Sequence, residues 1–139
     1  MEAVVARETV QRTLGVVGLA GIALIHLLDL PGKFGETPYL AWMYVALILG
    51  SIAVAAALLQ HSDPRAWATA AALALSVIAG YVISRTVGLP GSAGDIGNWG
   101  EPLGIASLFV EGFVVALSAA ALAERLPRRA RFGLMEVPG

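Results

Sequence analysis

Hydrophobic residues are concentrated in four long windows that are separated by short polar segments. The windows predict helices at approximately residues 13–30, 39–60, 66–85 and 103–123. A helix needs about 20 apolar residues to cross a bilayer, and each window is close to that length. None shows the alternation typical of a strand, and a helix satisfies its own backbone hydrogen bonds in lipid. The pattern therefore predicts an all-α integral membrane protein: four transmembrane helices in an up-down antiparallel bundle that forms a single domain over residues 1–139.

The polar segments between the windows carry the residues expected at helix ends. Pro31-Gly32 is expected to end the first helix. Ser62 and Asp63 precede Pro64, so either one is placed to cap the third helix. A glycine-rich stretch at residues 86–102 separates the last two helices and is predicted to be the longest loop, on the outer side of the membrane.

Basic residues in the short connections predict the orientation of the bundle, because cytoplasmic segments are enriched in lysine and arginine. Lys33 and Arg85 fall on one side, and seven arginines fall on the other. Those seven are Arg7, Arg12, Arg65, Arg125, Arg128, Arg129 and Arg131. Both termini are therefore expected in the cytoplasm and the chain in the cell membrane, where its basic tail (residues 126–132) can bind anionic lipid head groups.

Aromatic residues lie near the predicted membrane surfaces, at Tyr39, Trp42, Trp67 and Trp99. We expect these side chains to anchor the helices at the lipid–water interface.

Composition agrees with a membrane protein and narrows its chemistry. Hydrophobic residues make up 58% of the 139 residues and charged residues only 14%, against about a quarter in soluble domains. The absence of cysteine excludes disulfides and thiolate chemistry. The net charge of −1 indicates no nucleic-acid partner. The expected partners are the lipid bilayer and either further copies of the chain or a larger membrane protein.

Glu111 is the only charged residue between residues 102 and 123. It is expected about 12 Å below the outer start of the fourth helix, close to the middle of the bilayer. Small or polar residues recur with it at three- and four-residue spacing, namely Gly104, Ser107, Val114 and Ser118. Such a stripe is typical of a face packed against other helices, so Glu111 should point into the bundle. It marks either a functional site or an interhelical hydrogen bond that only stabilises the fold.

His26 and Asp29 share one helical face near the outer end of the first helix. A carboxylate beside an imidazole orients the ring, so the pair is a candidate metal ligand or proton-linked group. The alternative is a pair that simply helps the helix to end near the interface. His61 lies in the opposite connection, so haem held between two histidines is not expected, and the sequence identifies no cofactor.

Arg85 ends the third helix, with Tyr81 one turn before it. Its side chain can extend outward to water or turn inward to an acidic partner. The acidic candidates are Asp29, Asp95 and Glu101. A ladder of polar side chains is then expected to lead from Glu111 through Ser107, Tyr81 and His26 to Asp29.

Acidic residues outnumber basic ones on the predicted outer side, where Asp29, Glu36, Asp95 and Glu101 face Lys33 and Arg85. This excess can form a mouth that attracts cations. It can also follow from the exclusion of basic residues from outer segments.

Two resemblances accompany these patterns. The run SRTVGLPGSAGDIGNWGEPLGIASLFVEG, residues 84–112, resembles a stretch of small uncharacterised four-helix membrane proteins of actinobacteria. An arginine before a glycine-rich first helix, then His26, then GKFG at residues 32–35, is similar to the layout of DoxX-like proteins. The second resemblance implies a redox-associated membrane protein. The long outer loop and Glu111 depart from that pattern.

The leading functional hypothesis is a small non-enzymatic membrane protein with an outward-facing polar site for an ion, a proton or a small ligand. The site residues would be Glu111, His26, Asp29, Arg85, Tyr81 and Ser107. The alternative is an accessory subunit in which Glu111 pairs with a basic residue of a larger complex. An enzyme ranks last, because no nucleophile–base pair and no metal cluster is evident.

Overall fold

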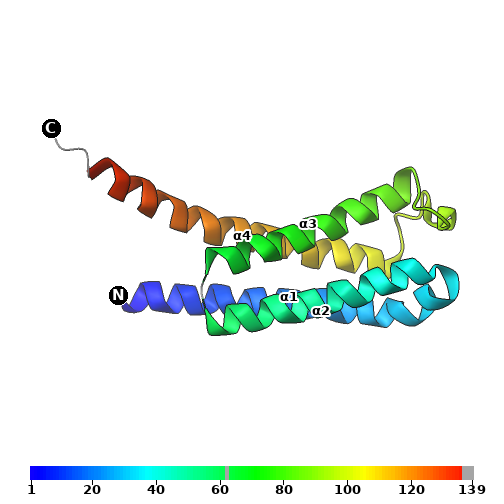
Figure 1. Ribbon diagram of the computed structural model, residues 1–139, viewed down its shortest axis with the longest axis horizontal. Helices are drawn as coiled ribbons and strands as arrows, with labels where there is room; N and C mark the ends of the chain where they lie inside the picture. The colour runs from blue at the N-terminus through cyan, green and yellow to red at the C-terminus, as the bar shows by residue number, and fades with distance from the viewer. Residues whose placement is uncertain (62, 136–139) are drawn as a thin grey trace.

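The computed structural model describes residues 1–61 and 63–135, with side chains described as far as Arg125. Four long helices make up the fold, and consecutive helices run antiparallel (Figure 1). They are α1 (Glu2–Glu36), α2 (Pro38–Gln60), α3 (Pro64–Thr86) and α4 (Pro102–Met135), with a short 3-10 turn, η1 (Ala93–Asp95), between α3 and α4. We call the end with Thr37 and residues 87–101 the loop end, and the end with the N-terminus the terminal end. The prediction of an all-helical fold with four long apolar helices is confirmed.

Proline residues open three of the helices, at Pro38, Pro64 and Pro102. Proline suits the first turn because the missing N–H has no helical partner there. The Asp63 carboxylate caps α3 by accepting a hydrogen bond of 2.8 Å from the backbone N–H of Arg65. Ser62, the other predicted cap, lies outside the described residues.

The prediction that Pro31-Gly32 ends the first helix is wrong, because α1 continues to Glu36. A proline inside a helix removes one backbone hydrogen bond, which membrane helices tolerate when neighbouring groups compensate. The helix ends instead where Thr37 leaves helical geometry, and its N–H still donates to the Lys33 carbonyl over 2.8 Å. A single residue therefore joins α1 to α2.

At the terminal end, α1 begins eleven residues earlier than the apolar window, at Glu2. Polar contacts with other helices explain this extension. Gln11 donates to Glu124 over 3.1 Å, and Arg7 forms an ion pair of 2.5 Å with the same carboxylate. The first helix is thus held to α4 over a length that hydrophobicity alone does not predict.

Small residues of α1 form a close-packing edge. A Cβ at Gly18 would lie 2.6 Å from Val114 of α4, and one at Gly21 would lie 3.1 Å from Val110. Gly15 faces the Trp67 ring in the same way, at 2.9 Å. Such contacts allow helix backbones to approach closely, which strengthens dispersion contacts between apolar helices.

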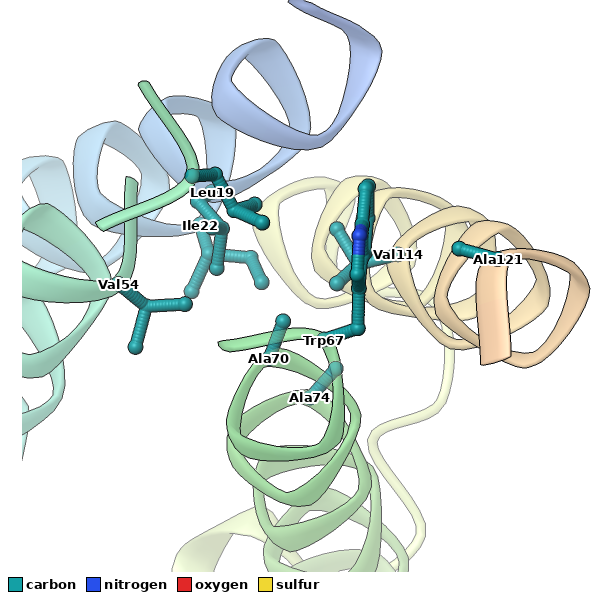
Figure 2. Close-up of a cluster of buried hydrophobic side chains, with 9 residues drawn as sticks. Leu19, Ile22, Val54, Trp67, Ala70, Ala74, Val114 and Ala121 are labelled. Atoms are coloured by element: carbon teal, nitrogen blue, oxygen red, sulfur yellow. The ribbon is translucent and has the colours of Figure 1, made fainter. Parts of the chain in front are cut away.

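Trp67 was predicted to anchor α3 at the membrane surface, and this prediction is wrong. The side chain is fully buried and belongs to the hydrophobic core. Figure 2 shows its ring beside Val114 of α4, with Leu19 and Ile22 of α1 in the same cluster. The space left by Gly15 admits the ring, so α3 directs it inward. Trp42 and Trp99 differ, since they are 65% and 46% exposed.

The outside of the bundle is apolar. Val17, Ile52, Leu75 and Phe109, one from each helix, are all more than half exposed. At most 28% of the residues in the four apolar windows are buried. In water, a contiguous apolar surface of this extent would be unfavourable. Each helix is long and apolar enough to cross a membrane.

Candidate functional site

A cavity of about 490 Å³ lies between the α1–α2 hairpin and the α3–α4 hairpin. All four helices line it, together with residues of the loop between α3 and α4. The volume falls within the range of about 300–1,000 Å³ that is usual for small-molecule sites. It extends from the loop end along α3 as far as Leu73, thirteen residues from Thr86, which corresponds to about 20 Å.

Two features create this space: the two hairpins pack weakly against each other along α2 and α3, and the side chains at the facing positions are small. Of the four neighbouring helix pairs, α2 and α3 share the least contact. The facing positions include Ala46 on α2, Ser76 and Gly80 on α3, and Gly104 on α4. None of these side chains is long enough to cross between the hairpins, so none of them fills the space.

Arg85 turns inward at the loop end, which decides between the two orientations considered from the sequence. Its side chain is only 6% exposed. One terminal nitrogen lies 2.6 Å from a Glu101 oxygen, and the other lies 3.6 Å from Asp95. Its Nε donates to the Asn98 carbonyl over 2.8 Å. Arg85 thus attaches the loop to the end of α3 through charge-assisted hydrogen bonds.

Tyr81 supports this arginine. The Arg85 guanidinium lies 4.5 Å from the centre of the Tyr81 ring, a cation–π distance. The Tyr81 hydroxyl donates to the Trp99 carbonyl over 3.3 Å, and the two rings meet edge to face. Gly104 makes room for the ring, since a Cβ there would lie 2.6 Å from it.

Lys33 joins α1 to the same loop. Its Nζ lies 3.7 Å from Asp95 and 3.3 Å from Glu36. Asp95 therefore bridges Lys33 and Arg85, which are 52 positions apart in the chain. Lys33 and Asp95 were not among the site residues predicted from the sequence, because their proximity depends on how the loop folds back.

His26 and Asp29 both line the cavity, with Tyr44 of α2 beside them. The Tyr44 hydroxyl donates to Asp29 over 3.3 Å, and its ring contacts the His26 ring edge to face at 4.8 Å. His26 Nδ1 bonds to the Ile22 carbonyl over 2.8 Å. Tyr44 was not predicted, because nothing in the sequence of α2 indicates which of its faces meets α1.

Glu111 lies beneath the cavity. It is fully buried, and Gly104, Ser107, Val114 and Ser118 are buried with it, so the predicted inward face of α4 is confirmed. The Ser107 hydroxyl donates to Glu111 Oε1. Within the described residues, Glu111 Oε2 has no hydrogen-bond partner.

The six residues proposed from the sequence therefore lie near one another but do not form a continuous ladder. Five of them line the cavity, and Glu111 contacts it through Ser107. The chain of hydrogen bonds stops there, because Tyr81 donates to Trp99 and His26 bonds to Ile22. Arg85 and Asp29 instead line the part of the cavity near the loop end.

The described residues contain no group of three or more histidine or acidic side chains that could hold a metal ion. Comparison with protein-family models, with curated proteins and with solved structures gives no match. The resemblances to DoxX-like and actinobacterial proteins therefore remain predictions, and the site is interpreted from its own residues.

Proposed function

We propose that this chain is a multi-pass membrane protein that binds a small amphiphilic ligand in the cavity between its two hairpins. The observation that carries the proposal is the cavity itself, which combines polar side chains at the loop end with apolar side chains deeper in the bundle. A concave, largely apolar space with a few convergent polar groups is the usual form of a small-molecule site.

The proposed setting is the cell membrane, with both termini in the cytoplasm. Four helices of sufficient length and an apolar exterior support insertion. Arg7, Arg12, Arg65 and Arg125 all belong to the terminal end, which supports this orientation under the positive-inside rule. The charged end of the cavity would then face the outer side.

The empty space also favours ligand binding over the alternative that the polar residues of the cavity only stabilise the fold. Gly80 lines it, and no atom lies within 4 Å of the position of a Cβ there. A well-packed structural interface would fill such a space, because protein interiors are close-packed.

A pair of glycine substitutions tests the proposal. Gly80→Phe places a ring in the cavity, whereas Gly112→Phe places the same ring on the exposed face of α4, where a Cβ also meets no atom within 4 Å. The purified protein in a non-ionic detergent is equilibrated by dialysis with three probes that share a naphthylmethyl group. They are 1-naphthylmethylamine, 1-naphthylmethanol and the anion of 1-naphthylacetic acid. Identical micelles without protein provide the blank.

We expect at least one probe to bind the unmodified protein, with binding lost in Gly80→Phe and kept in Gly112→Phe. Gly80→Leu, a smaller change, gives the same comparison if Gly80→Phe does not fold. Absence of binding by all three probes would contradict the proposal, as would equal binding by the cavity variant and the surface variant.

A further inference from the structure

The charged groups that line the cavity are not balanced. Three carboxylates (Asp29, Asp95 and Glu101) face two basic side chains (Lys33 and Arg85). The excess of one negative charge would be costly in a site surrounded by apolar helices. The pairing of these groups shows where the excess charge resides.

Both basic side chains are already engaged. Arg85 binds Glu101 at 2.6 Å and Asp95 at 3.6 Å, and its Nε is bonded to the Asn98 carbonyl. Lys33 binds Asp95 and the exposed Glu36. Neither cation is therefore free to bind an anionic ligand without breaking an existing pair.

Of the three carboxylates that line the cavity, Asp29 is the one without an ion pair among the described residues. Within the described part of the chain, no basic nitrogen lies within 4 Å of it, and its hydrogen bond comes from the neutral Tyr44 hydroxyl at 3.3 Å. Lys33 stands one helical turn further on α1 and contributes a favourable field, but its own contacts are with Glu36 and Asp95. Asp29 is half-buried and lines the cavity.

His26 adds a second acceptor next to this carboxylate. A carbonyl oxygen can only accept, so His26 Nδ1 must donate in its bond to Ile22. In the neutral ring, Nε2 then carries a lone pair and accepts. The Asp29 carboxylate and His26 Nε2 are therefore hydrogen-bond acceptors that face the cavity, and a matching ligand must donate hydrogen bonds to them.

The deeper walls require that the ligand also carry an apolar part. Leu47 of α2 and Leu73 and Val77 of α3 line the cavity below the charged end. A small hydrated metal ion would gain nothing from these walls. Ca²⁺ also needs about six to eight oxygen ligands, and the described residues offer no cluster of three metal-binding side chains.

We propose that the cavity binds a monovalent organic cation: a protonated amine whose ammonium group pairs with Asp29 and donates to His26, and whose apolar body lies between α2 and α3. This inference rests on the proposed function and specifies its ligand class. A hydrogen bond between an ammonium group and a carboxylate is roughly twice as strong as one between neutral groups. The aromatic ring of Tyr44, beside Asp29, adds a cation–π surface.

The naphthyl probes decide between ligand classes, because they share a body and differ in charge at neutral pH. We expect the amine to bind the unmodified protein at least about tenfold more tightly than the alcohol, and the acid to bind weakest. Asp29→Asn should remove the preference for the amine while leaving binding of the alcohol within about twofold.

Glu36→Gln is the matched control, since it removes one negative charge from the same end of α1. Its side chain is 68% exposed and does not line the cavity. Solvent screens such a charge, so amine binding should change by less than about twofold. The comparison of probes on the unmodified protein needs no variant, and it keeps the test decisive if Asp29→Asn does not fold.

Two outcomes would overturn the inference: tighter or equal binding of the alcohol or the acid, or a preference for the amine that Asp29→Asn leaves unchanged. If binding is still abolished by Gly80→Phe in either case, the cavity remains a ligand site and only the cationic class is rejected. If no probe binds, both the inference and the proposed function fail.

Discussion

At Gly18, the packing of α1 against α4 leaves no room for a side chain. A Cβ there would lie 2.6 Å from Val114 Cγ2, and Val114 is buried and β-branched, so it cannot rotate away freely. Gly18→Ala should lower the free energy of unfolding by about 1–3 kcal/mol through overpacking. Unfolding in detergent, followed by circular dichroism, measures this change.

Gly112→Ala is the control for Gly18→Ala, because nothing lies within 4 Å of the added Cβ. Alanine favours a helix over glycine by up to about 1 kcal/mol, so this variant should be unchanged or more stable. Equal destabilisation by both substitutions would show that the helix contact at Gly18 is not as close as described.

Glu111 offers a second test at the scale of a residue. Glu111→Gln keeps the shape and still provides an oxygen that accepts from Ser107, so stability should change by less than about 1 kcal/mol. Glu111→Ala removes the acceptor and leaves a cavity in the core, which should cost about 2–4 kcal/mol. The ratio of folded to unfolded protein in a denaturant series measures both.

A large loss of stability in Glu111→Gln would instead mean that the carboxyl proton or charge itself holds the bundle together. Glu111→Leu then separates the two explanations, since an apolar side chain of similar size restores packing without a polar group. Recovery of stability in Glu111→Leu would show that the buried carboxyl group destabilises the fold.

Single residues were predictable where the pattern was local. The three- and four-residue spacing of Gly104, Ser107 and Glu111 placed them on the inner face of α4, because one helix determines that spacing. The prediction that Trp67 anchors α3 at the membrane surface was wrong, because the rule that places aromatic residues at the interface considers depth alone. Depth does not reveal that Gly15, on another helix, leaves space for the ring.

At the scale of elements, the C-terminal end of α2 is completed by an arginine of α1. Arg12 Nε donates to the Leu58 carbonyl over 2.6 Å, and a terminal nitrogen donates to the Leu59 carbonyl over 2.5 Å. The last carbonyls of a helix lack helical partners and carry partial negative charge, so a bound cation stabilises them. This contact joins the two helices at the end opposite Thr37.

Arg12→Ala should therefore loosen the last turn of α2 and cost about 1–2 kcal/mol of stability. Hydrogen exchange of amides near Leu58 should accelerate, which mass spectrometry detects. Arg65→Ala removes the same charge from the same end of the bundle, where the residue is exposed, and should have little effect. Equal acceleration of exchange in both variants would argue for a general charge effect.

Hydrophobic windows predicted the number and approximate extent of the helices, but not all of their ends. The predicted end at Pro31-Gly32 assumed that proline stops a helix, and α1 continues to Glu36. The early start at Glu2 depends on contacts of Arg7 and Gln11 with Glu124. Contacts between positions more than a hundred residues apart leave no trace in a local pattern.

At the scale of the whole molecule, the two hairpins meet closely through α1 and α4 and less closely through α2 and α3. The loop between α3 and α4 lies at one end and is attached to Arg85 and Lys33. The N-terminus and the C-terminal part of α4 lie at the other end. The orientation of this arrangement in a membrane is a prediction that can be tested directly.

Single cysteines test the orientation, because the chain has none of its own. Gly94→Cys lies in the loop with open space around it, and His61→Cys lies between α2 and α3. A membrane-impermeant maleimide should label Gly94→Cys in intact cells and His61→Cys only after the membrane is permeabilised. The reverse pattern would invert the topology and place the cavity on the cytoplasmic side.

The sequence by itself determined an all-helical fold, four apolar helices and the inward face of α4 that carries Glu111, because each follows from the spacing of neighbouring residues. Only the tertiary structure decided that the hairpins leave a cavity and that Glu111 lies beneath it. It also decided which charges are paired. Lys33 and Arg85 neutralise acids of the distant loop, and Asp29 is left facing the cavity, because ion pairing depends on distances that only the folded chain defines.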